Sequence, residues 1–297
     1  MTSLSSLNEI PFYFPQLALT FSRLSQLAYL KFEEDRSFLE SELKVLELSL
    51  VDIYFSREIG TQAYLAIHKE YAVLVFRGTE KDFLDIVTDL RFRLELSDLG
   101  GVHRGFFAAL SSVSDEIEAG IKKVQHLPLY VTGHSLGGAL AKASVLSIQA
   151  SWQGCYTYGS PPICDFKRAE NIQVPVYRFI NAADVVPRAM SLGGFPVFLI
   201  RLILILIRKI FQWVGIRETW IFARIQILDL VAPDLNKYEH FGTPIYFEEA
   251  GMVVDGKEAP SLFWSIVARN WKRGFLDHSI ANYIGKLELQ ETLRGKK

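Results

Sequence analysis

The order of hydrophobic and polar residues predicts that strands and helices alternate along much of the chain. Residues Gln16–Leu30 space their apolar side chains like an amphipathic helix, and Ala63–Phe76 contains two strand-like runs. A third apolar run, Leu127–Val131, precedes a helix of small residues over Gly138–Ser144. The run Val176–Ile180 is rich in β-branched and aromatic residues and predicts another strand.

One segment, residues 193–220, is far more apolar than an ordinary connection between two elements. On a helical wheel, an arc of about 100° that is shared only with Ile205 holds Arg201, Arg208, Lys209 and Gln212, and the rest of the wheel is almost entirely apolar. Phe211, Trp213 and Trp220 add aromatic side chains of the kind enriched at headgroup depth. The pattern favours a helix that lies in a membrane interface.

Two other interpretations of this segment stay open. A membrane-spanning helix needs about 20 apolar residues, whereas the longest uncharged run across the centre, Leu202–Ile207, has six. Burial of the same surface within protein, as a cap or a dimer contact, would show the same pattern. We treat residues 189–225 as an apolar helical insertion within a single domain of residues 1–297, and expect Phe195–Trp220 to contact a membrane or lipid-droplet surface.

The most informative motif is the G-x-S-x-G sequence made by Gly133, Ser135 and Gly137. It lies between a predicted strand and the predicted small-residue helix, which is the context of a nucleophile elbow. Glycines on both sides keep Cβ atoms out of a tight strand-to-helix turn, so the serine hydroxyl would stand above a sheet edge. The bare motif recurs by chance, and the elements on either side make it specific.

A serine becomes a good nucleophile only when a base removes its proton and a carboxylate orients that base. Asp184 follows the predicted strand Val176–Ile180 in a polar loop closed by Pro187, where an orienting carboxylate would lie. His278, at the start of a C-terminal helix, is the candidate base. The order Ser135, Asp184, His278 is that of α/β-hydrolases.

Five motifs, in the same order, resemble those of the class 3 lipases, a family of α/β-hydrolases that act on acylglycerols and related esters. They are YAVLVFRGTE (Tyr71–Glu80), VHRGFFAAL (Val102–Leu110), GHSLGGALA (Gly133–Ala141), YTYGSPPICD (Tyr156–Asp165) and NAADVVP (Asn181–Pro187). The resemblance is good over residues 60–190, moderate near the C-terminus and poor between. It implies an α/β-hydrolase fold, with a central, mostly parallel sheet flanked by helices.

By this resemblance Ser135 attacks the ester carbonyl, His278 relays the proton and Asp184 holds the imidazole tautomer. The oxyanion hole would consist of the backbone N–H groups of Leu136 and Thr79. No metal or organic cofactor is implied. In the family a lid over the active site occupies the position of residues 80–100, but a plain surface helix would show the same apolar spacing.

Other histidines and aspartates compete for these roles. His240 lies in a segment that resembles a family strand preceding the catalytic histidine, and a histidine entering a strand is usually structural. His103 belongs to the V-H-x-G-F element, and His134 points away from the nucleophile on the elbow, so we interpret both as structural. Asp165 and Asp229 lack the N-x-x-D-x-V-P context of the chosen acid.

Composition limits the domain count, the class of binding partner and the cellular compartment. The 297 residues are 49% hydrophobic, enough for one α/β domain with a large core. A formal net charge of −1 argues against nucleic-acid binding, which needs a basic surface. Cys155 and Cys164 could form a disulfide, but so few cysteines fit a reducing compartment better, and the N-terminus lacks the features of a secretory signal. We expect a cytoplasmic protein, peripherally associated with membrane.

The expected function is that of a serine carboxylic-ester hydrolase in lipid degradation. It would be a lipase, phospholipase or galactolipase that cleaves acyl glycerolipids through an acyl-Ser135 intermediate. Two alternatives stay open: a catalytically silent α/β-hydrolase scaffold that binds lipid or a partner, and a soluble esterase for non-lipid esters.

Overall fold

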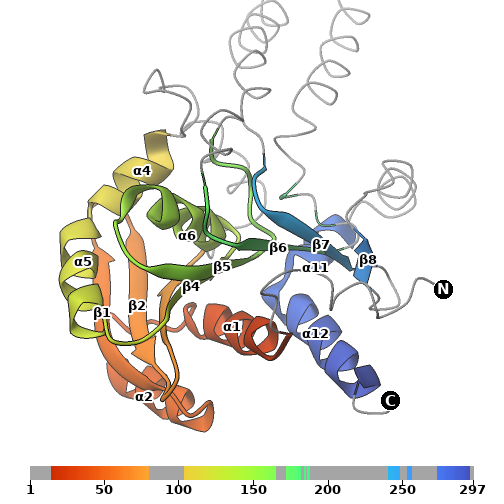
Figure 1. Cartoon of the computed structure of the whole chain (residues 1–297), viewed down its shortest axis with the longest axis horizontal. Coiled ribbons are helices and arrows are strands. Elements are labelled where there is room, and N and C mark those ends of the chain that lie inside the picture. The colour runs from red at the N-terminus through yellow and green to blue at the C-terminus, as the bar shows by residue number, and fades with distance from the viewer. Residues whose placement is uncertain are drawn as a thin grey trace, which may run out of the picture.

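The computed structural model describes residues 15–79, 104–164, 172–181, 184, 186–187, 240–247, 253–255 and 273–294 (Figure 1). Two expectations fall outside these residues: the helix or lid at residues 80–100, and the apolar insertion at residues 189–225. Among the residues described, no helix is long and apolar enough to cross a membrane.

An eight-stranded sheet forms the centre of the described part, with the strands in sequence order from edge to edge (Figure 1). The strands β3 to β7 run parallel, whereas β1 and β2 at one edge and β8 at the other pair in antiparallel fashion. The strands are β1 Ser49–Ser56, β2 Thr61–Ile67, β3 Ala72–Phe76, β4 Leu129–His134, β5 Trp152–Tyr158, β6 Val176–Asn181, β7 Thr243–Phe247 and β8 Val253–Asp255.

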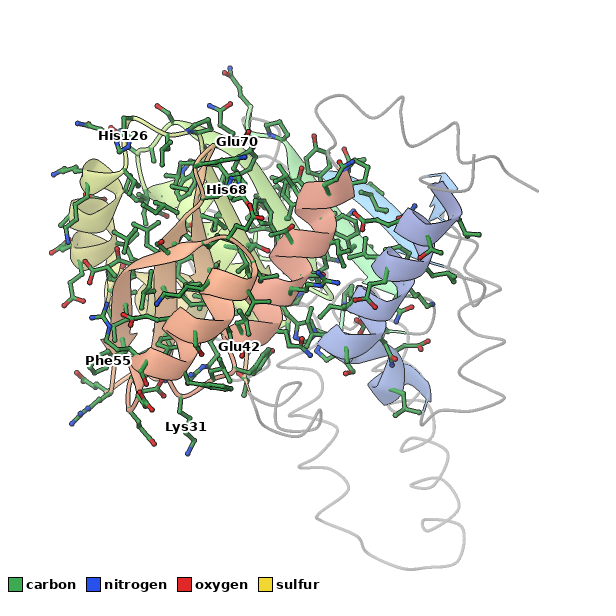
Figure 2. All side chains as sticks on the ribbon, turned by 90° about the horizontal axis from the view of Figure 1, so that it is seen from below. Lys31, Glu42, Phe55, His68, Glu70 and His126 are labelled. Carbon is green, nitrogen blue, oxygen red and sulfur yellow. The ribbon has the colours of Figure 1, made fainter. Side chains whose placement is uncertain are left out.

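Helices cover both faces of the sheet. Core residues of α4, α5 and α6 pack on one face, while α1, α2 and α12 lie across the other, as the view from below shows (Figure 2). The helices are α1 Pro15–Leu27, α2 Arg36–Val45, α4 Arg104–Ser111, α5 Ser114–Lys123, α6 Leu136–Ser147, α11 Arg273–His278 and α12 Ile280–Arg294.

The central strands are buried on both faces, which explains their continuous apolar sequences. All five residues of β3 are buried; Leu74 and Phe76 belong to the core under α6, whereas Val73 and Val75 belong to the core under α1. Successive side chains of a strand point to opposite faces, so a strand between two helical layers needs apolar residues at every position. Each core holds one helical layer against the sheet.

Sequence and structure agree on the elements that lead to the elbow. The helix predicted over Gln16–Leu30 is α1, which ends at Leu27, and the strand predicted at Leu127–Val131 is β4, which continues to His134. The strand therefore runs directly into the motif that carries the candidate nucleophile. Both cysteines are buried and free, so they form no disulfide.

Candidate active site

Ser135 occupies a tight turn between β4 and α6. Its backbone has φ 58° and ψ −126°, a region that residues with a side chain rarely adopt. The N–H of Ser135 donates to the carbonyl of Tyr158, at the end of the neighbouring strand β5, at 2.9 Å. The turn lies at the carboxyl ends of the parallel strands, the edge at which α/β sheets hold their ligands.

Two glycines make this turn sterically feasible. A Cβ on Gly133 would clash with the backbone carbonyl carbon of Gly137, and a Cβ on Gly137 would clash with the carbonyl oxygen of Phe76. Neither position accepts a side chain unless the backbone moves. The second clash also shows that the start of α6 packs against the end of β3.

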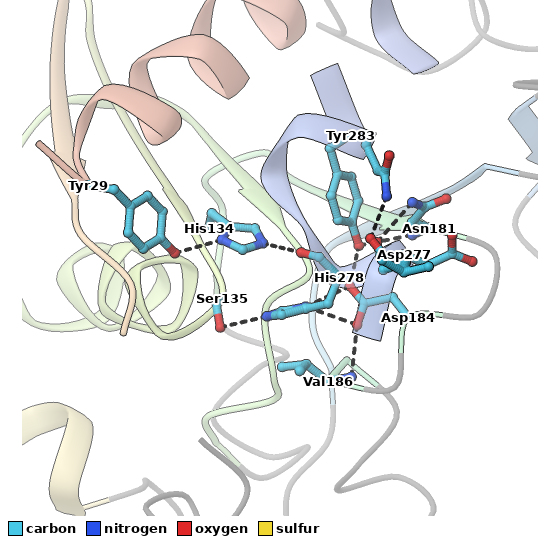
Figure 3. A network of polar contacts seen from close by, with 11 residues as sticks. Tyr29, His134, Ser135, Asn181, Asp184, Val186, Asp277, His278 and Tyr283 are labelled. Atoms are coloured by element: carbon cyan, nitrogen blue, oxygen red, sulfur yellow. Dashed lines mark hydrogen bonds and ion pairs between the residues drawn. The ribbon is translucent and has the colours of Figure 1, made fainter. Parts of the chain in front are cut away.

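His278 bridges Ser135 and Asp184 (Figure 3). Its Nε2 lies 2.9 Å from the serine Oγ, and its Nδ1 lies 3.0 Å from each carboxylate oxygen of Asp184. A carboxylate can only accept, so Nδ1 carries the proton and the neutral ring offers an unprotonated Nε2 to the serine hydroxyl. The structure thus brings together the three residues chosen from the sequence, with the tautomer that a general base needs.

The Asp184 side chain is fully buried and has donors besides the histidine. The N–H of Val186 donates to Oδ1 at 2.9 Å, and the hydroxyl of Tyr283 donates to Oδ2 at 2.6 Å. Burying an isolated carboxylate is costly, and these hydrogen bonds offset that cost. They also fix the carboxylate plane against the ring of His278.

Tyr283, on α12, is a site residue that the sequence analysis missed. Its hydroxyl accepts the N–H of Asn181 at 3.0 Å while it donates to Asp184. Asn181 ends β6, and its Nδ2 donates to the carbonyl of Asp277 at 2.9 Å. The end of β6 and the two C-terminal helices are therefore joined around the acid. In the sequence Tyr283 is simply an aromatic residue on the apolar face of a helix.

Gly159 lies against both the acid and the base. It adopts φ +60°, and a Cβ there would lie 2.7 Å from Oδ2 of Asp184 and 3.0 Å from Nδ1 of His278. Only glycine combines that backbone conformation with the lack of a side chain. The segment after β5 can therefore pass directly beside the histidine–carboxylate pair.

The residues expected to form the oxyanion hole lie at the same turn. Leu136 is the first residue of α6, so its N–H has no partner within the helix. Thr79 follows Gly78, whose backbone nitrogen would lie 2.9 Å from a Cβ on Gly137. The amino end of a helix favours negative charge, so this corner suits an oxyanion. The part that Leu136 and Thr79 take in catalysis stays a prediction.

The other histidines and aspartates considered for the triad fall into separate groups. Nε2 of His240 donates to the carbonyl of Pro187 at 2.6 Å, an interaction suited to a structural residue. His134 lies closer to the site than expected, since its ring centroid is 4.7 Å from that of His278. The other candidates, His103, Asp165 and Asp229, fall outside the described residues. Within the described part, no group of three potential ligand residues could hold a metal ion.

Comparisons with known proteins found a matching family and similar sequences. Residues 73–193 match the family model described as Lipase (class 3). A lipase of Rhizomucor miehei is 31% identical over 131 aligned residues, and the match covers 38% of this chain and 36% of that protein. The secreted mono- and diacylglycerol lipase 1 of Fusarium solani is 32% identical over 144 residues, with 43% of each chain covered. The chain therefore spans less than half the length of these relatives.

Among solved structures, lipase II from Rhizopus niveus matches with a TM-score of 0.60 and 20% sequence identity, over 89% of this chain and 92% of the other. At this identity the likeness concerns the fold. The α/β-hydrolase fold expected from the sequence is thereby confirmed.

Proposed function

Because the chain belongs to the class 3 lipase family, we propose that it is a serine ester hydrolase that cleaves the acyl esters of glycerolipids. The observation that carries the proposal is the hydrogen-bonded row of Ser135, His278 and Asp184, in which the imidazole proton faces the carboxylate. A serine hydroxyl bonded to an unprotonated imidazole nitrogen is a nucleophile with its base already in position.

In the first half-reaction Ser135 Oγ attacks the ester carbonyl carbon, and its proton passes to Nε2 of His278. The Asp184 carboxylate stabilises the imidazolium that forms. The N–H groups of Leu136 and Thr79 donate to the developing oxyanion; a fixed donor of this kind contributes about 3 kcal/mol to the transition state. His278 then gives its proton to the departing glycerol oxygen, which leaves an acyl-serine.

In the second half-reaction a water molecule takes the place of the alcohol. Nε2 of His278 removes one proton from the water while the water oxygen attacks the acyl carbon, and the same N–H groups stabilise the second oxyanion. The proton returns to Ser135 Oγ as the fatty acid leaves. The water oxygen and one of its protons leave in the fatty acid, and the other proton replaces the serine proton that left with the alcohol, so the enzyme ends in the state in which it began.

The substrate class suggests where the enzyme works. Acyl glycerolipids are insoluble and gather in membranes and droplets, and the apolar segment Phe195–Trp220 with its basic stripe supports peripheral docking at such a surface. Deletion of residues 195–214 should abolish binding to liposomes that contain anionic phospholipid, while hydrolysis of a soluble short-chain ester persists. Liposome binding equal to that of the full chain would contradict docking by this segment.

The hydrolase proposal is tested with p-nitrophenyl butyrate and with triacylglycerol and phospholipid dispersions. The wild-type chain should cleave both kinds of substrate and gain activity sharply at the lipid surface, whereas Ser135→Ala and His278→Ala should lose turnover. His240→Ala, with thermal unfolding checked, is the histidine control and should remain active. Activity on the soluble ester alone would favour a non-lipid esterase, and a folded wild type inert on every substrate would favour a binding scaffold.

A further inference from the structure

His134, the residue before the nucleophile, has both ring nitrogens hydrogen-bonded inside the protein (Figure 3). Its Nε2 lies 2.6 Å from the backbone carbonyl oxygen of His278, and its Nδ1 lies 2.7 Å from the hydroxyl of Tyr29. The residue is 5% exposed, and its ring is tilted by 35° against the ring of His278. The side chain therefore contacts both the backbone and the imidazole of the candidate base.

The chemistry of these partners fixes the direction of each hydrogen bond. A carbonyl oxygen can only accept, so Nε2 of His134 carries the proton and donates to His278. Burial, together with the neighbouring His278, lowers the pKa of His134 to about 3, so the ring is neutral at ordinary pH. The unprotonated Nδ1 then accepts a hydrogen bond from the Tyr29 hydroxyl. We call this row of hydrogen bonds, which runs from the Tyr29 hydroxyl through His134 to the carbonyl of His278, the Tyr29–His134 chain.

The His278 carbonyl needs such a donor because of its place in the fold. His278 is the last residue of α11, and α12 begins at Ile280 after a single intervening residue. Carbonyl groups in the last turn of a helix have no partner within that helix. His134 therefore supplies from β4 a hydrogen bond at the very residue whose ring must reach Ser135.

Tyr29 also touches the loop after β3. A Cβ on Gly78 would clash with the Tyr29 hydroxyl, so the two are in close contact. Arg77 also binds the segment around Tyr29: its Nε donates to the carbonyl of Ala28 at 2.5 Å, and its guanidinium binds Glu33 at 2.8 and 3.0 Å. The segment that carries the Tyr29 hydroxyl is thus clamped to the loop that leads to Thr79.

We propose that Tyr29 and His134 are positioning residues for the hydrolysis, because the Tyr29–His134 chain holds the backbone of His278 so that its imidazole stays aligned with Ser135. The inference rests on the proposed function. Asp184 fixes the rotation of the ring through Nδ1, while His134 fixes the backbone from which the ring extends. A displacement of about 1 Å in a catalytic group lowers the rate about 100-fold, so a lost backbone contact at this residue has a measurable effect.

The test compares variants that keep or remove each part of the chain. His134→Phe keeps an aromatic ring against His278 but removes both hydrogen bonds, whereas His134→Gln keeps an N–H that can reach the carbonyl. Tyr29→Phe removes only the hydroxyl. Ser25→Ala is the matched control, since its hydroxyl forms a buried hydrogen bond, 3.1 Å long, between α1 and Thr132 of β4, two residues before His134.

With p-nitrophenyl butyrate, His134→Phe should lower kcat about 10- to 100-fold with KM changed less than about 3-fold. The loss should be equal at pH 6 and pH 9, because His134 stays neutral over that range. His134→Gln should recover kcat to within about 5-fold of wild type, and adding Tyr29→Phe to His134→Phe should cause no further loss, since the two act as one chain. Ser25→Ala should keep the wild-type kcat.

A second measurement does not depend on turnover. In protein labelled with 15N-histidine, the Nδ1–H proton of His278 bonded to Asp184 gives a downfield resonance, assigned by its loss in Asp184→Asn. It should shift or broaden in His134→Phe and in Tyr29→Phe but persist in Ser25→Ala. If wild type is inert on esters while this dependence holds, the hydrolase proposal fails, but the Tyr29–His134 chain still holds His278 in place.

Either of two results would overturn the positioning role. One is a folded His134→Phe whose kcat stays within about 2-fold of wild type and whose His278 resonance is unchanged. The other is an equal loss of kcat in Ser25→Ala, which would mean that any loosening of α1 from β4 disturbs the site. Should His134→Phe not fold, Tyr29→Phe and His134→Gln carry the same comparison.

Discussion

Replacing Tyr283 by phenylalanine removes one hydroxyl from the candidate acid and leaves the rest of the side chain in place. That hydroxyl donates to Oδ2 of Asp184 at 2.6 Å and accepts the N–H of Asn181 at 3.0 Å. A hydrogen bond to a charged group contributes about 1.5–3 kcal/mol, and depriving a buried N–H of this acceptor costs about 1 kcal/mol more. We expect Tyr283→Phe to lower the free energy of unfolding by about 3 kcal/mol.

The effect on turnover should be smaller. Asp184 keeps the N–H of Val186 and the Nδ1–H of His278, so the row of three residues remains but its carboxylate is less firmly held. We expect kcat on p-nitrophenyl butyrate to fall about 5- to 10-fold, which corresponds to about 1–1.4 kcal/mol, with little change in KM. Urea unfolding followed by tryptophan fluorescence measures the stability.

Tyr64→Phe is the matched control for this substitution. Tyr64 is fully buried in the same core, and its hydroxyl donates to the neutral carbonyl of Leu24 at 2.8 Å. Tyr64→Phe should lower the free energy of unfolding by about 1 kcal/mol and leave kcat unchanged. If Tyr283→Phe loses no more stability than Tyr64→Phe and turns over at the wild-type rate, the reasoning about the Asp184 carboxylate is refuted.

Three other substitutions test separate contacts. Gly159→Ala should lower kcat about 100-fold, because its Cβ would lie 2.7 Å from Oδ2 of Asp184. Gly60→Ala, also at positive φ but in open space, is the control and should lower the free energy of unfolding by only about 1 kcal/mol. Equal kcat values in Gly159→Ala and Gly60→Ala would contradict the predicted clash. Burial lowers the pKa of Lys142 from 10.5 to about 7, so the folded chain binds fewer protons than the unfolded chain between these values. The free energy of unfolding, relative to Lys142→Met, should therefore rise by about 1 kcal/mol per pH unit from pH 7 to 8.5 in urea titrations; parallel curves would count against it. The lowered pKa of His134 affects stability in the acid range. Relative to His134→Phe, the free energy of unfolding of wild type should fall by about 1 kcal/mol per pH unit as the pH falls from 6.5 towards 4. An equal dependence of stability on pH in both proteins would argue for a solvated ring.

The parts of the site that lie within one motif could be predicted from the sequence. The elbow is such a case, since Gly133 and Gly137 are needed for contacts within a few residues of Ser135. The order of serine, acid and base, together with the N-x-x-D-x-V-P context of the acid and the position of His240 at the start of a strand, selected Asp184 and His278, and the structure brings both to Ser135. Local steric requirements leave a local sequence pattern.

The residues that hold the candidate triad from a distance could not be predicted. Tyr283 is 99 positions from the acid that it contacts, and Tyr29 is 105 positions from His134. Both read as ordinary aromatic residues of amphipathic helices, because a single hydroxyl directed at a buried partner leaves no periodic signal. His134 was interpreted as structural because it points away from the nucleophile on the elbow, and its contact with His278, 144 positions away, left no signal in the sequence.

Because of polar residues, the sequence also predicted too early an end for the strand that leads to the nucleophile. The predicted strand stopped at Val131 because Thr132 and His134 are polar, yet β4 continues to His134. Thr132 is fully buried, and its hydroxyl donates to the carbonyl of Tyr156 at 2.8 Å. A buried strand tolerates polar side chains when each finds a partner inside the protein, and only the three-dimensional structure identifies that partner.

The most direct test of the hydrolase proposal is reaction with a fluorophosphonate, which transfers a phosphonyl group only to a nucleophilic serine that a base has activated. Intact-protein mass spectrometry should show one added group on the wild-type chain, and peptide analysis should locate it at Ser135. Ser135→Ala should stay unlabelled, and the rate of labelling of His278→Ala should be lower by about 100-fold or more. A folded wild-type chain that takes up no label, or takes it up at another serine, would contradict the account.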